Sequence, residues 1–175
     1  MKYFIIFGLL IFLGVMFYLD IFKFIISPKY YEGLVVVPIL LIAELCYGIV
    51  FNLSLWYKNI DKTYWAIVFT MIGFVVMMSI IITCVPIYGY IACAWAALAC
   101  NLSMMIASYA IGNKINPIKY DVGRIFSYVI TAIVLYSISF FTTTSYFWLN
   151  ILINTLLIGV YIVIVLKREN IKLKR

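Results

Sequence analysis

The chain has no charged residue between Lys62 and Lys114, an uninterrupted run of 51 residues. As a single helix this run would be about 76 Å long at about 1.5 Å per residue. The hydrocarbon core of a bilayer is only about 30 Å thick, so the run must cross a membrane, turn and cross back. The turn is expected at residues 85–90, which read VPIYGY, because proline and glycine interrupt helices and tyrosine favours the membrane interface.

The hydropathy pattern of the remaining residues predicts membrane spans along the whole chain. A second uncharged run of 42 residues separates Arg124 from Lys167, with a turn expected at residues 142–146, and two shorter apolar runs precede Lys62. We therefore predict an all-α, polytopic membrane helix bundle with six transmembrane helices. The bundle occupies residues 1–166 and a basic cytoplasmic tail occupies residues 167–175. The expected spans are residues 3–26, 34–56, 64–84, 91–111, 125–141 and 147–166.

Composition excludes several classes of function. Only 11% of residues are charged and 67% are hydrophobic, whereas a soluble domain carries about 25% charged residues. A soluble enzyme and a soluble nucleic-acid binder are therefore excluded. The chain has no histidine, no paired carboxylates and no GxSxG or phosphate-loop motif, so we expect no enzyme activity, no cofactor and no metal. The cysteines lie in apolar segments without a CxxC pair and are expected to be packing residues: Cys46, Cys84, Cys93 and Cys100.

The basic residues predict the orientation of the bundle. With six spans, 11 of the 13 lysines and arginines fall on the side that also holds both termini, and only Lys23 and Lys29 fall on the other side. Cytoplasmic segments carry the excess of Lys and Arg in membrane proteins. Both termini are therefore expected in the cytoplasm of a bacterial inner membrane, with the bilayer as a partner and no nucleic acid.

Glu44 is the one charged residue deep within an expected span. A charge at that depth costs about 2.5–3.5 kcal/mol or more, so the side chain should face protein, water or a partner. One hypothesis places Glu44 in a transport pathway, and the other makes it a neutral carboxyl group bonded to a neighbouring helix. Tyr47 and Asn52 make the same span the most polar, and the three residues are our candidates for lining a cavity.

Small and amide side chains predict how the helices associate. Gly89, Cys93 and Ala97 repeat every four residues in the fourth span, which allows close approach of helix backbones. Ala92, Ala96 and Cys100 form a second row with the same spacing, so we expect this helix to be central. Amide and hydroxyl groups in the fourth and sixth spans favour hydrogen bonds between helices over ligand contacts: Asn101, Ser103, Ser108, Asn150 and Asn154.

Three motifs in residues 27–113 occur together: residues 30–41 read YYEGLVVVPILL, residues 52–58 read NLSLWYK and residues 86–96 read PIYGYIACAWA. This segment resembles the C-terminal half of bacterial polysaccharide biosynthesis proteins. Those proteins are Wzx-type oligosaccharide flippases of the multidrug/oligosaccharidyl-lipid/polysaccharide exporter superfamily.

The resemblance implies a role in flipping undecaprenyl-pyrophosphate-linked oligosaccharides for export as lipopolysaccharide or capsule. It also implies that the six helices correspond to the C-terminal portion of a fourteen-helix carrier. The N-terminal lobe, or a second copy of the chain, would then be needed as a partner. The alternative is a non-transporting multi-pass accessory or scaffold protein of polysaccharide assembly.

The predicted topology can be tested by cysteine labelling. Single cysteines at Lys58 and Lys119, in a chain without its native cysteines, should both react with an impermeant maleimide only after the cells are permeabilised. The reason is that both loops are expected in the cytoplasm. Labelling of the two positions from opposite faces of intact cells would overturn the six-span arrangement.

Overall fold

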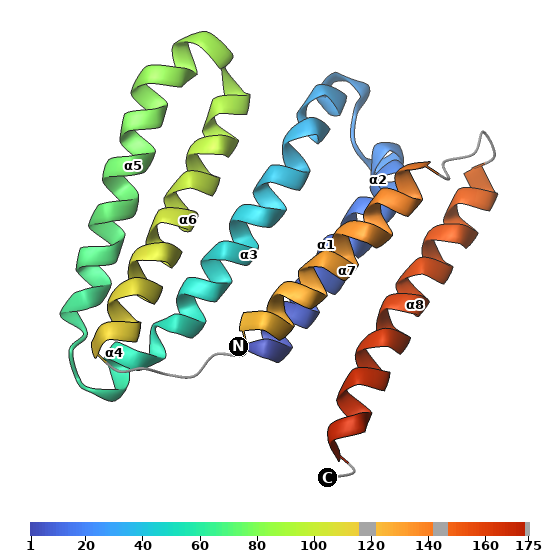
Figure 1. Cartoon of the computed structure of the whole chain (residues 1–175). Helices are drawn as coiled ribbons and strands as arrows, with labels where there is room; N and C mark the ends of the chain where they lie inside the picture. Colours follow the sequence, from blue (N-terminus) through green and yellow to red (C-terminus); the bar gives the residue numbers. More distant parts are fainter. Residues whose placement is uncertain (116–121, 142–146, 174–175) are drawn as a thin grey trace. The chain divides into compact units, whose positions relative to one another are not determined.

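The computed structural model describes residues 1–115, 122–141 and 147–173, and throughout these residues the regular structure is helical. The predicted all-α fold is therefore confirmed. The predicted turn at residues 142–146, Lys119 and residues 174–175 lie outside the described residues. In chain order the elements are α1 (Lys2–Phe17), α2 (Leu19–Ile25), the 3₁₀ helix η1 (Pro28–Val36), α3 (Val37–Leu53), α4 (Leu55–Asn59), α5 (Tyr64–Tyr88), α6 (Tyr90–Ile115), α7 (Val122–Phe141) and α8 (Phe147–Leu173) (Figure 1).

The described helices have the length and composition of membrane spans. Four stretches are long and apolar enough to cross a bilayer: Pro28–Asn59, Tyr64–Tyr88, Tyr90–Ile115 and Asn150–Lys167. The apolar helices Lys2–Phe17 and Ser127–Ser139 are shorter. Large apolar side chains of α5 stay uncovered, with Ile67 64%, Phe74 53% and Ile82 71% exposed. Such surfaces suit contact with lipid chains, and together these features are those of a membrane protein.

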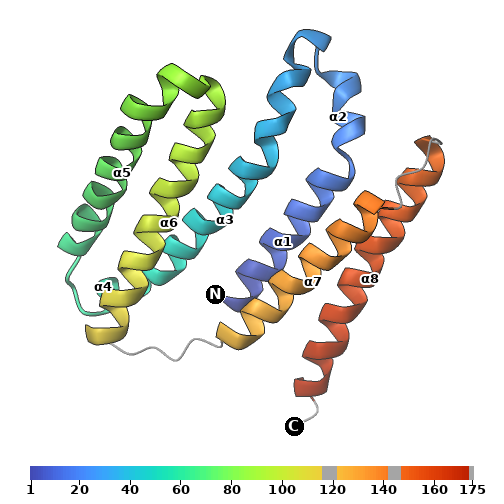
Figure 2. The same ribbon diagram turned by 45° about the horizontal axis from the view of Figure 1, so that its top comes forward.

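The contacts divide the chain into two compact units. Unit 1 consists of Met1 and Glu32–Tyr120, and unit 2 of Lys2–Tyr31 and Asp121–Arg175. In unit 1, α6 lies between α3 and α5 and packs on both (Figures 1 and 2). The central place predicted for this span is confirmed within unit 1. In unit 2, α1, α7 and α8 pack against one another.

The turn between α5 and α6 is tighter than predicted. The helix α5 continues through Pro86 to Tyr88, and Gly89 alone reverses the chain with a φ of +60°. Proline in the final turn removes only one late hydrogen bond, and the positive φ is readily adopted only by glycine. The Gly89 N–H donates to the Val85 carbonyl (2.9 Å) and closes α5.

Pro38 does not interrupt α3, because it stands in the first turn of the helix, where its missing N–H is not needed.

The first predicted span, residues 3–26, is interrupted at Tyr18. The Ile21 N–H donates to the Tyr18 carbonyl (2.9 Å) instead of continuing the helical pattern to Phe17. The Phe17 carbonyl accepts a hydrogen bond from Asn154 Nδ2 on α8 (3.0 Å). A carbonyl left open in an apolar environment is costly, so the amide of Asn154 compensates for the break.

Asn154 also connects the third helix of unit 2. Its Oδ1 accepts a hydrogen bond from Ser139 Oγ on α7 (2.7 Å). The Tyr18 hydroxyl and Thr155 Oγ1 form a further link of 2.8 Å between the break and α8. The prediction that Asn154 joins helices is therefore confirmed.

Replacing Asn154 by alanine should destabilise the protein by roughly 1–2 kcal/mol, because it removes two interhelical hydrogen bonds and leaves the Phe17 carbonyl open. Equilibrium unfolding of the purified protein in mixed micelles measures the effect. Ser137→Ala is the matched control, since Ser137 Oγ bonds only to the Ile133 carbonyl of its own helix (2.9 Å). Equal stability of the two variants would contradict the bridging role of Asn154.

Candidate functional site

A groove of about 290 Å³ lies in unit 1, where α3 ends and α5 begins. Tyr47 and Phe51 of α3, Lys58 of α4 and Thr70 of α5 line it, with Met104 of α6 behind them. Because α3 ends and α5 begins here, the groove lies at the ends of two apolar spans rather than at their middle. It combines apolar walls with hydroxyl groups and a cation.

Lys58 is positioned by the end of the short helix α4. The Lys62 N–H donates to the Tyr57 carbonyl (2.9 Å) and the Asp61 N–H to the Lys58 carbonyl (3.2 Å). With Asp61 at a φ of +52°, this is the Schellman arrangement that terminates helices. The backbone of Lys58 is fixed, and its exposed ammonium group lies 4.8 Å from the centroid of the Phe51 ring.

An aromatic cluster supports the groove from behind. Trp56 is 1% exposed, and its ring lies 5.3 Å from Tyr57, 6.0 Å from Trp65 and 6.3 Å from Phe69, measured between centroids. Tyr57 and Phe69 line the groove directly. The cluster therefore joins α4 to α5 and holds the two walls in place.

Two small residues of α6 accommodate Trp56. Its Nε1 donates to Ser108 Oγ (3.4 Å), and a Cβ added to Gly112 would lie 2.8 Å from the same nitrogen. Only a residue without a side chain leaves room for the indole here. Gly112 was not among the predicted site residues, although its place four residues after Ser108 puts both residues on one face of α6.

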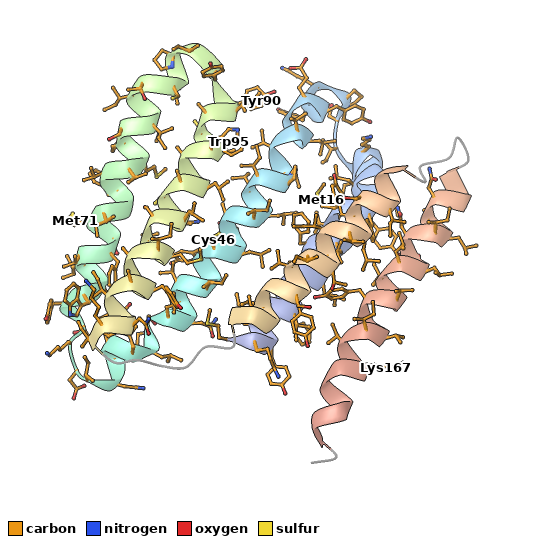
Figure 3. The ribbon with its side chains drawn as sticks, in the orientation of Figure 1. Met16, Cys46, Met71, Tyr90, Trp95 and Lys167 are labelled. Carbon is orange, nitrogen blue, oxygen red and sulfur yellow. The ribbon has the colours of Figure 1, made fainter. Side chains whose placement is uncertain are left out.

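Only one of the three residues predicted to line a cavity lies in the groove. Tyr47 lines the groove, whereas Glu44 and Asn52 do not. Asn52 Nδ2 instead donates to the Gly48 carbonyl of its own helix (3.0 Å). Glu44 is exposed and stands two residues, or about 200° of rotation, from the buried Cys46 that is labelled on α3 in Figure 3.

Of the two small-residue rows predicted in the span that forms α6, the one through Ala92 and Ala96 is buried in unit 1. Cys93 is exposed, a Cβ at Gly89 would meet no atom within 4 Å, and Ala97 is half-buried. The neighbouring row is half-buried at Cys100 and buried at its other members: Ala92, Ala96, Met104, Ser108 and Gly112. The helix-packing role expected of Gly89, Cys93 and Ala97 stays a prediction.

The covered row winds slowly around α6, as rows at a spacing of four residues do. Its members therefore contact different neighbours. A Cβ at Gly73 of α5 would lie 2.8 Å from Met104 Cγ and 2.9 Å from Cys100 Sγ.

Asn101 Nδ2 donates to the Ala43 carbonyl of α3 (2.9 Å), which confirms its predicted role between helices. At the opposite end from the groove, the hydroxyl of Tyr90, labelled in Figure 3, donates to the Glu32 carbonyl (3.3 Å).

The chemistry available in the groove is recognition rather than catalysis. Lys58 is the only charged residue among the described residues that line the groove. No described carboxylate lines it. The described part of the chain contains no group of three or more His, Cys, Asp or Glu residues able to hold a metal ion. An ammonium group beside phenol and threonine hydroxyls can bind an anion by charge and hydrogen bonds.

Gly112→Ala should destabilise unit 1 by about 1–3 kcal/mol, because the added methyl group would overlap the rigid Trp56 ring. Equilibrium unfolding in mixed micelles measures the loss. Gly14→Ala in α1 is the control, since a Cβ there would meet nothing within 4 Å. If both substitutions leave stability unchanged, Trp56 does not depend on the space at Gly112.

Comparisons of the chain with known protein families, with curated proteins and with solved structures found no match.

Proposed function

We propose that the chain is part of a carrier that moves lipid-linked oligosaccharides across the bacterial inner membrane for polysaccharide export. The observation that carries the proposal is that the segment resembling Wzx-type flippases, residues 27–113, coincides closely with unit 1, Glu32–Tyr120. In alternating-access carriers, compact bundles rock against each other around the substrate site. A segment that packs as one compact bundle fits that role.

The orientation in this proposal follows from the basic residues. With six spans, both termini and 11 of 13 lysines and arginines are cytoplasmic. The basic tail at residues 167–175 would then lie near the anionic inner leaflet, which attracts each basic residue by about 1 kcal/mol.

A carrier also needs a second bundle, because its substrate site lies between two bodies that move. The proposal therefore includes a further helical lobe or a second copy of the chain. The exposed Glu44 supports this requirement, since a carboxylate on the surface of an apolar span is costly in lipid and is better placed against a partner or a water-filled pathway. The substrate in the proposal is an undecaprenyl-pyrophosphate-linked oligosaccharide.

One observation favours the second candidate, a non-transporting scaffold of polysaccharide assembly. The amides of Asn52 and Asn101 both donate to backbone carbonyls, and neither residue lines the groove. Spans whose polar groups are used for packing suit a protein that only presents a surface to enzymes.

Deletion of the gene separates the two candidates. Loss of a carrier should abolish surface polysaccharide while lipid-linked repeat units accumulate at the cytoplasmic face. Loss of a scaffold should reduce synthesis of the lipid-linked units themselves. Unchanged surface polysaccharide and unchanged lipid-linked units would contradict both.

Complementation with Glu44→Gln tests the pathway more finely. If Glu44 faces the pathway, surface export should fall by about tenfold, which corresponds to about 1.4 kcal/mol. Ser79→Ala is the matched control, because Ser79 is an exposed span residue whose hydroxyl donates to Val75 of its own helix (2.8 Å). Normal export by the Glu44→Gln variant would remove Glu44 from the pathway.

A further inference from the structure

The groove at the junction of α3, α4 and α5 has features that the carrier proposal does not use. Its charged group, Lys58, makes no ion pair with a described carboxylate, and its ammonium is instead held over the Phe51 ring at 4.8 Å. A cation–π contact leaves the outer side of the ammonium open to an anion. An anion bound there would neutralise the positive charge of Lys58.

The position of the groove specifies where such an anion comes from. Apolar span residues lie on one side of it, and the polar Lys58–Lys62 segment lies on the other. This is the level at which the phosphate groups of a bilayer are found, because the hydrocarbon core ends where the apolar helices end.

The surface beside the groove is shaped for a molecule with one polar and one apolar end. Phe51, whose ring lies under the cation, is 66% exposed, and Ile67, which follows the lining residue Ala66 on α5, is 64% exposed. Tyr47 and Thr63 add hydroxyl-bearing side chains to the lining of the same groove. Ordinary free anions would use the cation and hydroxyls but not the apolar flank.

From these observations we infer that the groove binds the headgroup of an anionic phosphoglycerol lipid, with the phosphate at Lys58 and an acyl chain along Phe51 and Ile67. The volume of about 290 Å³ suits a small headgroup. Basic pockets between transmembrane helices bind anionic lipid headgroups in this manner. A zwitterionic choline lipid is disfavoured because its own cation would approach Lys58. The inference is independent of the proposed carrier function.

The test is a titration of the purified, delipidated full chain with short-chain phosphatidylglycerol, followed by native mass spectrometry. Wild-type protein should bind the lipid saturably. Lys58→Gln should weaken binding by about fivefold, the equivalent of about 1 kcal/mol for one basic residue near a membrane surface. Lys58→Arg should retain binding because it keeps the charge.

Lys62→Gln is the matched control, since Lys62 lies four residues away and does not line the groove. It should bind phosphatidylglycerol like the wild type. Equal weakening by Lys58→Gln and Lys62→Gln would overturn the inference in favour of diffuse surface charge, and unchanged binding by Lys58→Gln would overturn it outright.

Two competition arms identify the ligand. Phosphatidylcholine and soluble glycerol 3-phosphate should fail to displace the bound lipid. Displacement by glycerol 3-phosphate alone would mean that the groove is a free-phosphate site and would overturn the lipid assignment. Should Lys58→Gln fail to fold, the wild-type protein still decides the matter: added salt must weaken phosphatidylglycerol binding, and salt-independent binding refutes a role for Lys58.

Discussion

The absence of water around apolar spans is the constraint on which the rest of this structure depends. In lipid every backbone carbonyl and N–H must be paired within the protein, and the described chain is helical throughout. Where a regular helix is interrupted or ends, backbone N–H groups and polar side chains supply hydrogen-bond partners. Asn154 donates to the carbonyl freed at Phe17, and Ser54 Oγ donates to the Phe51 carbonyl (2.6 Å) where α3 passes into α4. Polar residues in the spans are therefore used first to satisfy backbone groups.

The same need to pair backbone polar groups explains how the candidate groove is built. Ser54 has helical backbone angles, and α4 continues from α3 so that Trp56 enters a space left by Ser108 and Gly112 of α6. The Schellman arrangement then ends α4 and holds Lys58 at the rim of the groove. The end of the helix just after Lys58 therefore places the cation of the groove.

Two proposals rest on this architecture and use different surfaces. The carrier proposal concerns the face of α3 that bears the exposed Glu44, which needs a partner or a pathway. The lipid proposal concerns the groove at Lys58, which is complete within unit 1. Failure of one leaves the other standing, because no residue is shared between their critical tests.

Much of the fold followed from the sequence alone, because the positions of charged residues limit where an apolar chain can leave a membrane. The predicted spans became helices, and Asn101 and Asn154 join helices as their polarity in apolar segments suggested. Tertiary structure alone decided which face of each helix is covered. Glu44 is exposed, and of the two predicted small-residue rows the one through Ala96 is buried whereas Cys93 is exposed, because rotation about a helix axis is set by neighbouring helices. A helix that is apolar on nearly all faces does not indicate from its sequence which face is buried.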